Sequence, residues 1–164
     1  MQEKFMRRAI EIARESVEEP GTLPYGAVVV KDGEIIGEGL NRSAATSDPT
    51  SHGEVEAIRD ACRRLSVTSL KGADLYTSGE PCSMCVATMY QVGIKRLFYA
   101  GAASDSAAFF QRLAAHDPKW TRSLSNQQLR HQVGLPLDER EMAAEQVLRE
   151  GILDVYEAFI ERHT

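Results

Sequence analysis

Two short stretches of the chain carry side chains that can hold and use a metal ion. TSHGEVEAI contains His52 and Glu54, and SGEPCSMC contains Cys82 and Cys85. Histidine nitrogen and cysteine sulfur are ligands of zinc, and a catalytic zinc commonly has three protein ligands and one open position. We therefore expect His52, Cys82 and Cys85 to bind one zinc ion, with room left for water.

Glu54 indicates an enzyme rather than a structural metal site. It follows His52 by two positions, so it cannot easily bind the same ion with good geometry, but it can reach water beside the metal. Zinc lowers the pKa of such water toward neutrality. A carboxylate there can take a proton as general base and return it, as general acid, to a ring nitrogen and a departing amine.

The first stretch is expected to begin a helix over residues 52–65. Ser51 and Glu54 form an S-x-x-E pattern, which predicts a capping box at the helix start. Val55, Ile58 and Ala61 recur at helical spacing and predict its buried face.

The second stretch is also expected to begin a helix, running to Met89, because Pro81 suits the first helical position. Cys82 and Cys85 are three residues apart and then lie on the same side of the first turn. The positive ends of both helices favour thiolate over thiol. The two helix starts are thus expected to converge on one ion.

The other elements that must position these residues follow from apolar periodicity. An antiparallel hairpin is expected to turn at Asp32-Gly33, a dipeptide suited to tight turns. Two consecutive strand–helix–strand units predict parallel pairing joined to that hairpin, in a mixed sheet with helices on both faces. The predicted strands span residues 26–31, 34–40, 73–77 and 95–100, and the first helix spans residues 3–18.

The pattern is less regular beyond residue 101. A helix is expected over residues 104–116, a polar loop over 117–128, and a long helix over 138–162 in which Gly151 can break the helix. The segment LRHQVGL fits either a strand or a helix.

Composition and charge are those of one globular domain. The 164 residues are 43% apolar and 26% charged, and the net charge of −5 argues against a nucleic-acid partner, which usually needs a basic face. No apolar run is long enough to span a membrane, and the charged N-terminus lacks a signal-peptide core. Three cysteines in such a chain favour metal or redox chemistry in a reducing, cytoplasmic setting.

Simpler interpretations of the same residues remain open. Glu54 can serve only to cap its helix, and C-x-x-C can be a redox pair. A closed structural zinc site needs a fourth ligand, for which the sequence offers only histidines of the C-terminal third: His116, His131 and His163. These three are expected at the surface, and Cys62 is expected to fill the core.

The order H-x-E followed by P-C-x-x-C is the signature of zinc-dependent nucleobase deaminases. From about residue 5 to 101 the chain resembles the cytidine deaminase-like superfamily, in its cytosine, guanine and tRNA-adenosine deaminase branch. PYGAVVVKDGEIIGEGLN, DPTSHGEVEAI and LYTSGEPCSMC carry the resemblance. It implies a single α/β domain over residues 1–164, a three-layer α/β/α fold around a five-stranded mixed sheet, with residues 102–164 as a divergent C-terminal region.

The resemblance also assigns the site. It implies zinc held by His52, Cys82 and Cys85, with Glu54 as proton shuttle. Substrate contacts are implied for three residues: the Asn41 side chain, the Gly53 backbone and the Tyr25 ring. A homodimer that acts on a small amino-heterocycle is expected.

The substrate is less well defined by the resemblance. LYTSGEPCSMC and PYGAVVVKDG look most like guanine deaminases, whereas HGE in place of HAE is similar to fungal cytosine deaminases. The second carboxylate that guanine deaminases carry after the fourth strand has no counterpart in AASDSAAFFQRLAAH, where Asp105 is the nearest acid. Guanine deamination is our first expectation. Cytosine deamination and tRNA adenosine-to-inosine deamination are the alternatives.

Overall fold

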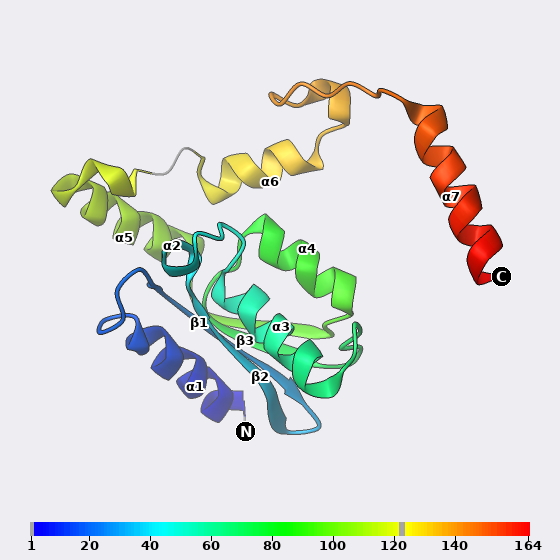
Figure 1. Ribbon diagram of the computed structural model, residues 1–164. Coiled ribbons are helices and arrows are strands. Elements are labelled where there is room, and N and C mark those ends of the chain that lie inside the picture. Colours follow the sequence, from blue (N-terminus) through cyan, green and yellow to red (C-terminus); the bar gives the residue numbers. More distant parts are fainter. Residues whose placement is uncertain (1, 122–123) are drawn as a thin grey trace. The chain divides into compact units, whose positions relative to one another are not determined.

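The computed structural model describes residues 2–121 and 124–164. The chain divides into two compact units, Met1–Arg130 and His131–Thr164. The first unit contains the sheet and its helices (Figure 1). Its elements are α1 (Gln2–Glu15), β1 (Leu23–Lys31), β2 (Glu34–Asn41), α2 (Ser43–Thr46), α3 (Gly53–Leu65), β3 (Asp74–Gly79), α4 (Ser83–Val92), β4 (Arg96–Gly101), α5 (Ala103–His116) and η1 (Pro118–Trp120).

The sheet has four strands in the order β2-β1-β3-β4, so the five-stranded expectation is wrong for the described residues. The segment after β4 continues as the helix α5, and the segment LRHQVGL lies in or directly after α6 (Asn126–Gly134). Neither segment has the period-two alternation of a strand. The mixed α/β architecture itself is confirmed.

The strand directions agree in part with the parallel pairing that was predicted for the two strand–helix–strand units. β3 and β4 are parallel, as predicted. β2 and β3 run the same way but are not neighbours, because β1 lies between them and pairs antiparallel with both. The helix α3 therefore crosses over β1.

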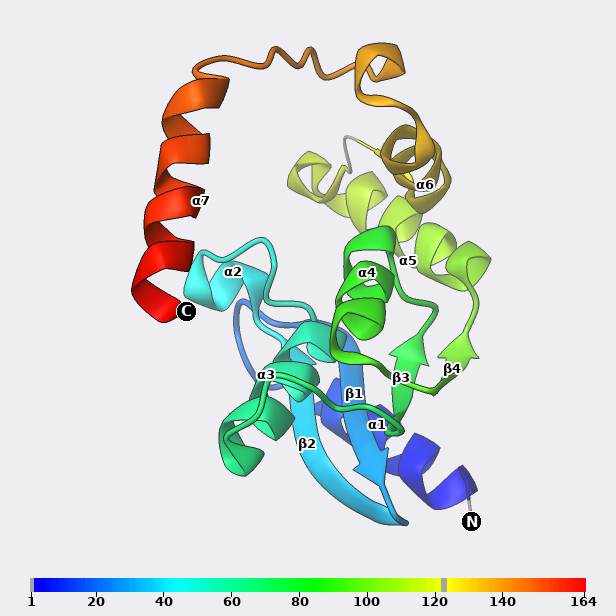
Figure 2. The same ribbon diagram turned by 90° about the vertical axis from the view of Figure 1, so that its right-hand side faces the viewer.

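Each face of the sheet is covered by helices, which gives the predicted three layers (Figures 1 and 2). On one face, Phe5 and Ile12 of α1 pack against Val28 and Val30. On the other face, α3 and α4 pack against β1 and β3. Alternate residues of β1 point to opposite faces, and both faces are apolar because both are buried.

The second unit is mostly helical and exposed. It contains the end of α6, η2 (Leu137–Glu139) and α7 (Arg149–His163). The long helix predicted over residues 138–162 is wrong in its first part, since the ten residues before Arg149 are not α-helical, and Gly151 lies inside α7 without a break. The polar loop predicted over 117–128 includes η1 and the start of α6, and its residues 122–123 lie outside the described part. No described helix has the length and apolar character that a bilayer crossing requires.

Candidate active site

His52 and Cys82 are the N-cap residues of the two helices that the sequence singled out. His52 precedes α3 and Cys82 precedes α4, both with extended backbones, and neither side chain caps its own helix. Cys85 follows in the first turn of α4 and is fully buried. The helix predicted from Pro81 therefore starts two residues later, at Ser83, because Cys82 takes the capping position.

The three ligand atoms have the separations that zinc requires. Cys82 Sγ lies 3.6 Å from Cys85 Sγ and 3.6 Å from His52 Nδ1, and Cys85 Sγ lies 3.4 Å from His52 Nδ1. Bonds of about 2.3 Å to sulfur and about 2.0 Å to nitrogen, at tetrahedral angles, place two sulfurs about 3.8 Å apart and sulfur about 3.5 Å from nitrogen. His52, Cys82 and Cys85 thus fit one zinc ion.

The two cysteines have different electrostatic surroundings. Their mutual contact, followed by the contact with His52, lowers the pKa of Cys82 to about 3. The same contact and burial raise the pKa of Cys85. Thiolate character is thus favoured at Cys82, and thiolate is the form of cysteine that binds zinc.

Glu54 lies beside this cluster and below the surface. It is 4% exposed, its Oε2 is 3.5 Å from Cys85 Sγ, and its Oε1 accepts a hydrogen bond of 3.3 Å from the Thr77 hydroxyl. Burial raises the pKa of Glu54 above its usual range. A buried carboxyl group that binds and releases protons nearer to neutral pH is suited to proton transfer.

The predicted capping box at Ser51 and Glu54 is wrong. The Ser51 hydroxyl donates instead to Glu56 Oε1 at 3.0 Å, and Arg59 donates to the same oxygen at 2.6 Å. The Glu54 carboxylate faces Thr77 and Cys85, and the amide of the N-cap residue His52 donates to the Thr50 carbonyl instead of to Glu54. A role in helix capping therefore does not explain why residue 54 is a glutamate.

Close backbone packing holds α3 against the two strands that carry the predicted substrate residues. A Cβ on Gly53 would lie 2.3 Å from the Tyr25 carbonyl oxygen, and a Cβ on Gly39 would lie 2.3 Å from Ala57 N. Both distances are shorter than a side chain tolerates. Glycine at these positions lets the start of α3 approach β1 and β2, which brings His52 toward Asn41.

Asn41 and Tyr25 are fixed at the edge of the same pocket. Asn41 is 3% exposed, and its Oδ1 accepts bonds from the Ser43 amide at 3.2 Å and the Ser43 hydroxyl at 2.8 Å. The Tyr25 hydroxyl is 2.5 Å from Ser106 Oγ, and its ring stacks on Phe110. Side-chain orientation at both residues is therefore set by hydrogen bonds and stacking.

A cavity of about 30 Å³ joins these residues. It is lined by five residues that the sequence predicted: Tyr25, Asn41, His52, Glu54 and Cys82. It is also lined by four that the sequence reasoning did not assign: Leu23, Glu80, Ser106 and Asn126. A volume of about 30 Å³ is the share of one water molecule, so the cavity provides a water-sized space beside Glu54 and the metal cluster.

Glu80 is the additional carboxylate at this cavity. Arg130 donates to its Oε1 at 2.7 Å and the Ala103 amide donates to its Oε2 at 2.9 Å. The bond from Arg130 lowers the pKa of Glu80, which keeps it ionised. Asp105, the nearest acid after β4 in the sequence, accepts from the Ala102 amide at 2.8 Å and caps α5 instead. In the sequence, the position of Glu80 in the motif SGEPC, two residues before Cys82, could have indicated that it lies at the site.

The remaining candidate ligands lie elsewhere. His116, His131 and His163 are exposed, as expected. Cys62 packs against the core of α3 and α4, also as expected. Tyr156 and Phe159, the aromatic residues of the C-terminal segment, are exposed on α7 of the second unit.

This fold and metal cluster define a zinc deaminase. Residues 1–101 match the family model of the cytidine and deoxycytidylate deaminase zinc-binding region, and the chain belongs to that family. It is accordingly a hydrolase acting on C–N bonds, and its His/Cys/Cys cluster fits the zinc of the family.

Individual relatives come from two branches. A guanine deaminase of Bacillus subtilis is 47% identical over 105 residues, which cover 64% of this chain and 67% of the relative. A tRNA-specific adenosine deaminase of Agrobacterium fabrum is 40% identical over 118 residues, covering 68% and 77%. The solved structure of a guanine deaminase from Bacillus subtilis matches 98% of this chain and 94% of its own, with 35% identity and a TM-score of 0.82.

Proposed function

We propose that the chain deaminates a free amino-heterocycle, with a guanine-type base as the first candidate. The observation that carries the proposal is the shared cavity: Asn41, Glu54 and two residues of the metal cluster line one pocket. The 47% identity to a guanine deaminase supports the choice of base.

The proposed reaction uses Glu54 as the proton carrier. Zinc, when bound, supplies water of lowered pKa. Glu54 takes a proton from the water as the oxygen bonds to the amino-bearing ring carbon. It delivers that proton to the ring nitrogen and then moves the remaining proton of the new hydroxyl group to the amino group, whose C–N bond breaks to release ammonia. Water is consumed and the ring gains an oxygen, so no electrons are exchanged with a cofactor.

Orientation of the base is proposed to depend on Asn41, Tyr25 and the backbone of Gly53. The bonds from Ser43 fix the Asn41 oxygen, so its amide NH₂ presents a donor of set direction to an acceptor on the ring. Tyr25 offers a ring face that Phe110 and Ser106 hold in place. Gly53 offers backbone polar groups at the start of α3.

Adenosine in tRNA is the second candidate, because a tRNA-specific adenosine deaminase is 40% identical over much of the chain. The net charge of −5 weighs against a substrate that carries a phosphate backbone. Cytosine is a third candidate, with the HGE motif in its favour.

The discriminating experiment is an ammonia-release screen with the zinc content measured in every sample. It includes guanine, cytosine, adenine, their nucleosides and diaminotriazine, beside an inosine assay on tRNA transcripts. We expect turnover of a free base, guanine first. Inosine formation in tRNA without turnover of any free base would contradict the proposal, and zinc-loaded protein that is inactive on the whole panel would reject catalysis on these substrates.

A further inference from the structure

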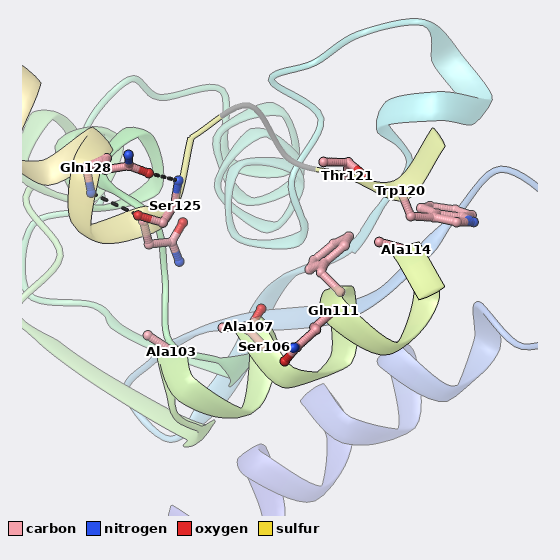
Figure 3. Close-up of a pocket in the computed structure, with 11 residues that line it drawn as sticks. Ala103, Ser106, Ala107, Gln111, Ala114, Trp120, Thr121, Ser125 and Gln128 are labelled. Atoms are coloured by element: carbon pink, nitrogen blue, oxygen red, sulfur yellow. Dashed lines mark hydrogen bonds between the residues drawn. The ribbon is translucent and has the colours of Figure 1, made fainter. Parts of the chain in front are cut away.

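A second and larger cavity adjoins the metal pocket. It has a volume of about 320 Å³ and lies between α5, η1 and the start of α6, as Figure 3 shows. Ser106 and Asn126 line both this cavity and the metal pocket. The two cavities are therefore neighbours that share these two side chains in their walls.

The large cavity has an apolar wall, and its described lining residues carry no charge. Its apolar wall is formed by two aromatic rings and three alanines: Phe110, Trp120, Ala103, Ala107 and Ala114. Every other described lining residue is a neutral polar one, and none is a lysine, arginine, aspartate or glutamate. An apolar group is favoured against this wall, and none of the described lining residues supplies a charge to pair with an ionic group.

The first turn of α6 is well anchored, so the cavity has a defined wall. The Gln128 amide donates to Ser125 Oγ at 3.2 Å and the Ser125 amide donates to Gln128 Oε1 at 2.9 Å, a reciprocal capping box (Figure 3). Arg130, one turn further, donates to Glu80 beside the metal ligands. These contacts hold Asn126 in the walls of the two cavities.

We infer that the large cavity binds the non-reacting part of the substrate, and that the enzyme prefers amino-heterocycles bearing a neutral apolar substituent or second ring. This inference rests on the proposed deaminase function and names its substrate class. The volumes support it: a cavity of about 150 Å³ can hold benzene, so about 320 Å³ accommodates a phenyl-sized group. The pocket of about 30 Å³ does not.

Matched pairs of compounds test the inference. Zinc-loaded protein is assayed with guanine and benzylguanine, cytosine and benzylcytosine, and diaminotriazine and phenyl-diaminotriazine. We expect kcat/KM for the substituted member of at least one pair to exceed that of the compact member by about tenfold or more. Compact members that are turned over as well as or better than every substituted partner would overturn the inference and leave the proposed function standing.

Two neighbouring alanines provide a matched pair of variants. Ala107 and Ala108 are consecutive exposed residues of α5, but only Ala107 is in the cavity wall. Ala107→Leu should lower the preference for the substituted compound by about tenfold, whereas Ala108→Leu should keep the preference of the unchanged protein. Equal preferences in the two variants would contradict the inference.

Fluorescence gives a readout that does not depend on turnover. Trp120 is the sole tryptophan of the chain and lines the cavity. Phenyl-diaminotriazine should change its emission saturably, and diaminotriazine should not. An emission that responds to protein concentration but not to the phenyl compound would show that a second copy fills the cavity, and would overturn the inference. Saturable binding without ammonia release would support the cavity as a binding site while rejecting the proposed reaction.

Discussion

The hydroxyl of Thr77 on β3 donates a hydrogen bond of 3.3 Å to the carboxylate of Glu54 on α3. Both side chains are buried, Thr77 completely. The bond fixes one carboxylate oxygen and leaves the other near Cys85, 3.5 Å from its sulfur. A strand of the sheet thus orients the group that we propose as the proton carrier.

Glu54→Gln should retain zinc and lose ammonia release. Glutamine has nearly the same shape but cannot carry a proton, and removal of a general acid–base group costs about 10²- to 10⁴-fold in kcat. Ammonia assays and zinc analysis of the purified variant measure both quantities. Glu56→Gln, two residues along α3, is the control and should stay close to the unchanged protein. Wild-type turnover in Glu54→Gln would remove Glu54 from the mechanism.

Thr77→Val should reduce kcat by about ten- to a hundredfold, because a lost hydrogen bond to a charged group is worth about 1.5–3 kcal/mol. Valine keeps the volume of threonine but has no hydroxyl. Thr77→Ser keeps the hydroxyl and should recover most of the rate. A pH–rate profile separates orientation from simple damage, since Thr77→Val should also shift the pH dependence that is ascribed to Glu54. Equal rates and profiles in both variants would show that the contact has no catalytic role.

Removal of zinc should abolish activity and lower the melting temperature, because an ion that binds only the folded state stabilises it by mass action. Cys85→Ser should contain far less zinc than the unchanged protein, since it lacks a thiolate ligand. Cys62→Ser is the matched control: this third cysteine packs against the core without joining the ligand cluster, and its zinc content should be normal. Full zinc occupancy in Cys85→Ser would exclude Cys85 as a ligand.

The metal cluster and the location of Glu54 beside it were predictable from sequence because each helix start carries its residues close together in the chain. His52 and Glu54 are two residues apart, Cys82 and Cys85 are three apart, and each pair stands at a helix start. The hairpin at Asp32-Gly33 was predictable for the same reason. The sheet order was not, because the insertion of β1 between β2 and β3 depends on contacts between distant segments.

Two polar residues that line the pocket were not predicted from the sequence. Ser106 and Asn126 are not metal-ligand residue types and do not belong to a recognisable sequence motif. They reach the pocket only through the packing of α5 and α6. The capping pattern was misassigned for a related reason. In the S-x-x-E pattern of residues 51–54, the glutamate belongs to the metal site and not to a capping box. The S-x-x-Q pattern of residues 125–128 does form a capping box.

The ion pair of Arg8 and Glu38 should make stability depend on pH. Arg8 donates two bonds to the Glu38 carboxylate, at 2.8 and 2.7 Å. The bond from Arg8 lowers the pKa of Glu38 from its ordinary 4.5 in the folded state. The ion pair therefore contributes its full stabilisation of the fold above about pH 4.5, the ordinary carboxyl pKa. That stabilisation is lost as the pH falls through the lowered pKa of Glu38.

Arg8→Met should lower the free energy of unfolding at neutral pH by at most about 1 kcal/mol, since both side chains are partly exposed. The difference from the unchanged protein should shrink as the pH falls below the carboxyl range. Urea unfolding at several pH values measures it. Arg14→Met, at an exposed position of the same helix, is the control and should show a smaller, less pH-dependent change. A difference that grows on acidification would contradict the assignment.

Gly39→Ala should separate α3 from the sheet and weaken the metal site. The added Cβ would lie 2.3 Å from both Ala57 N and Gly53 O, which are backbone atoms that no rotamer change can move. We expect a loss of about 1–3 kcal/mol in unfolding free energy and a lower zinc affinity, because His52 is attached to the displaced end of α3. Gly151→Ala has no atom within 4 Å of its new Cβ and should be neutral or slightly stabilising. Urea unfolding and zinc titration compare the two variants. Wild-type values for Gly39→Ala would show that the close approach of β2 and α3 does not position the site.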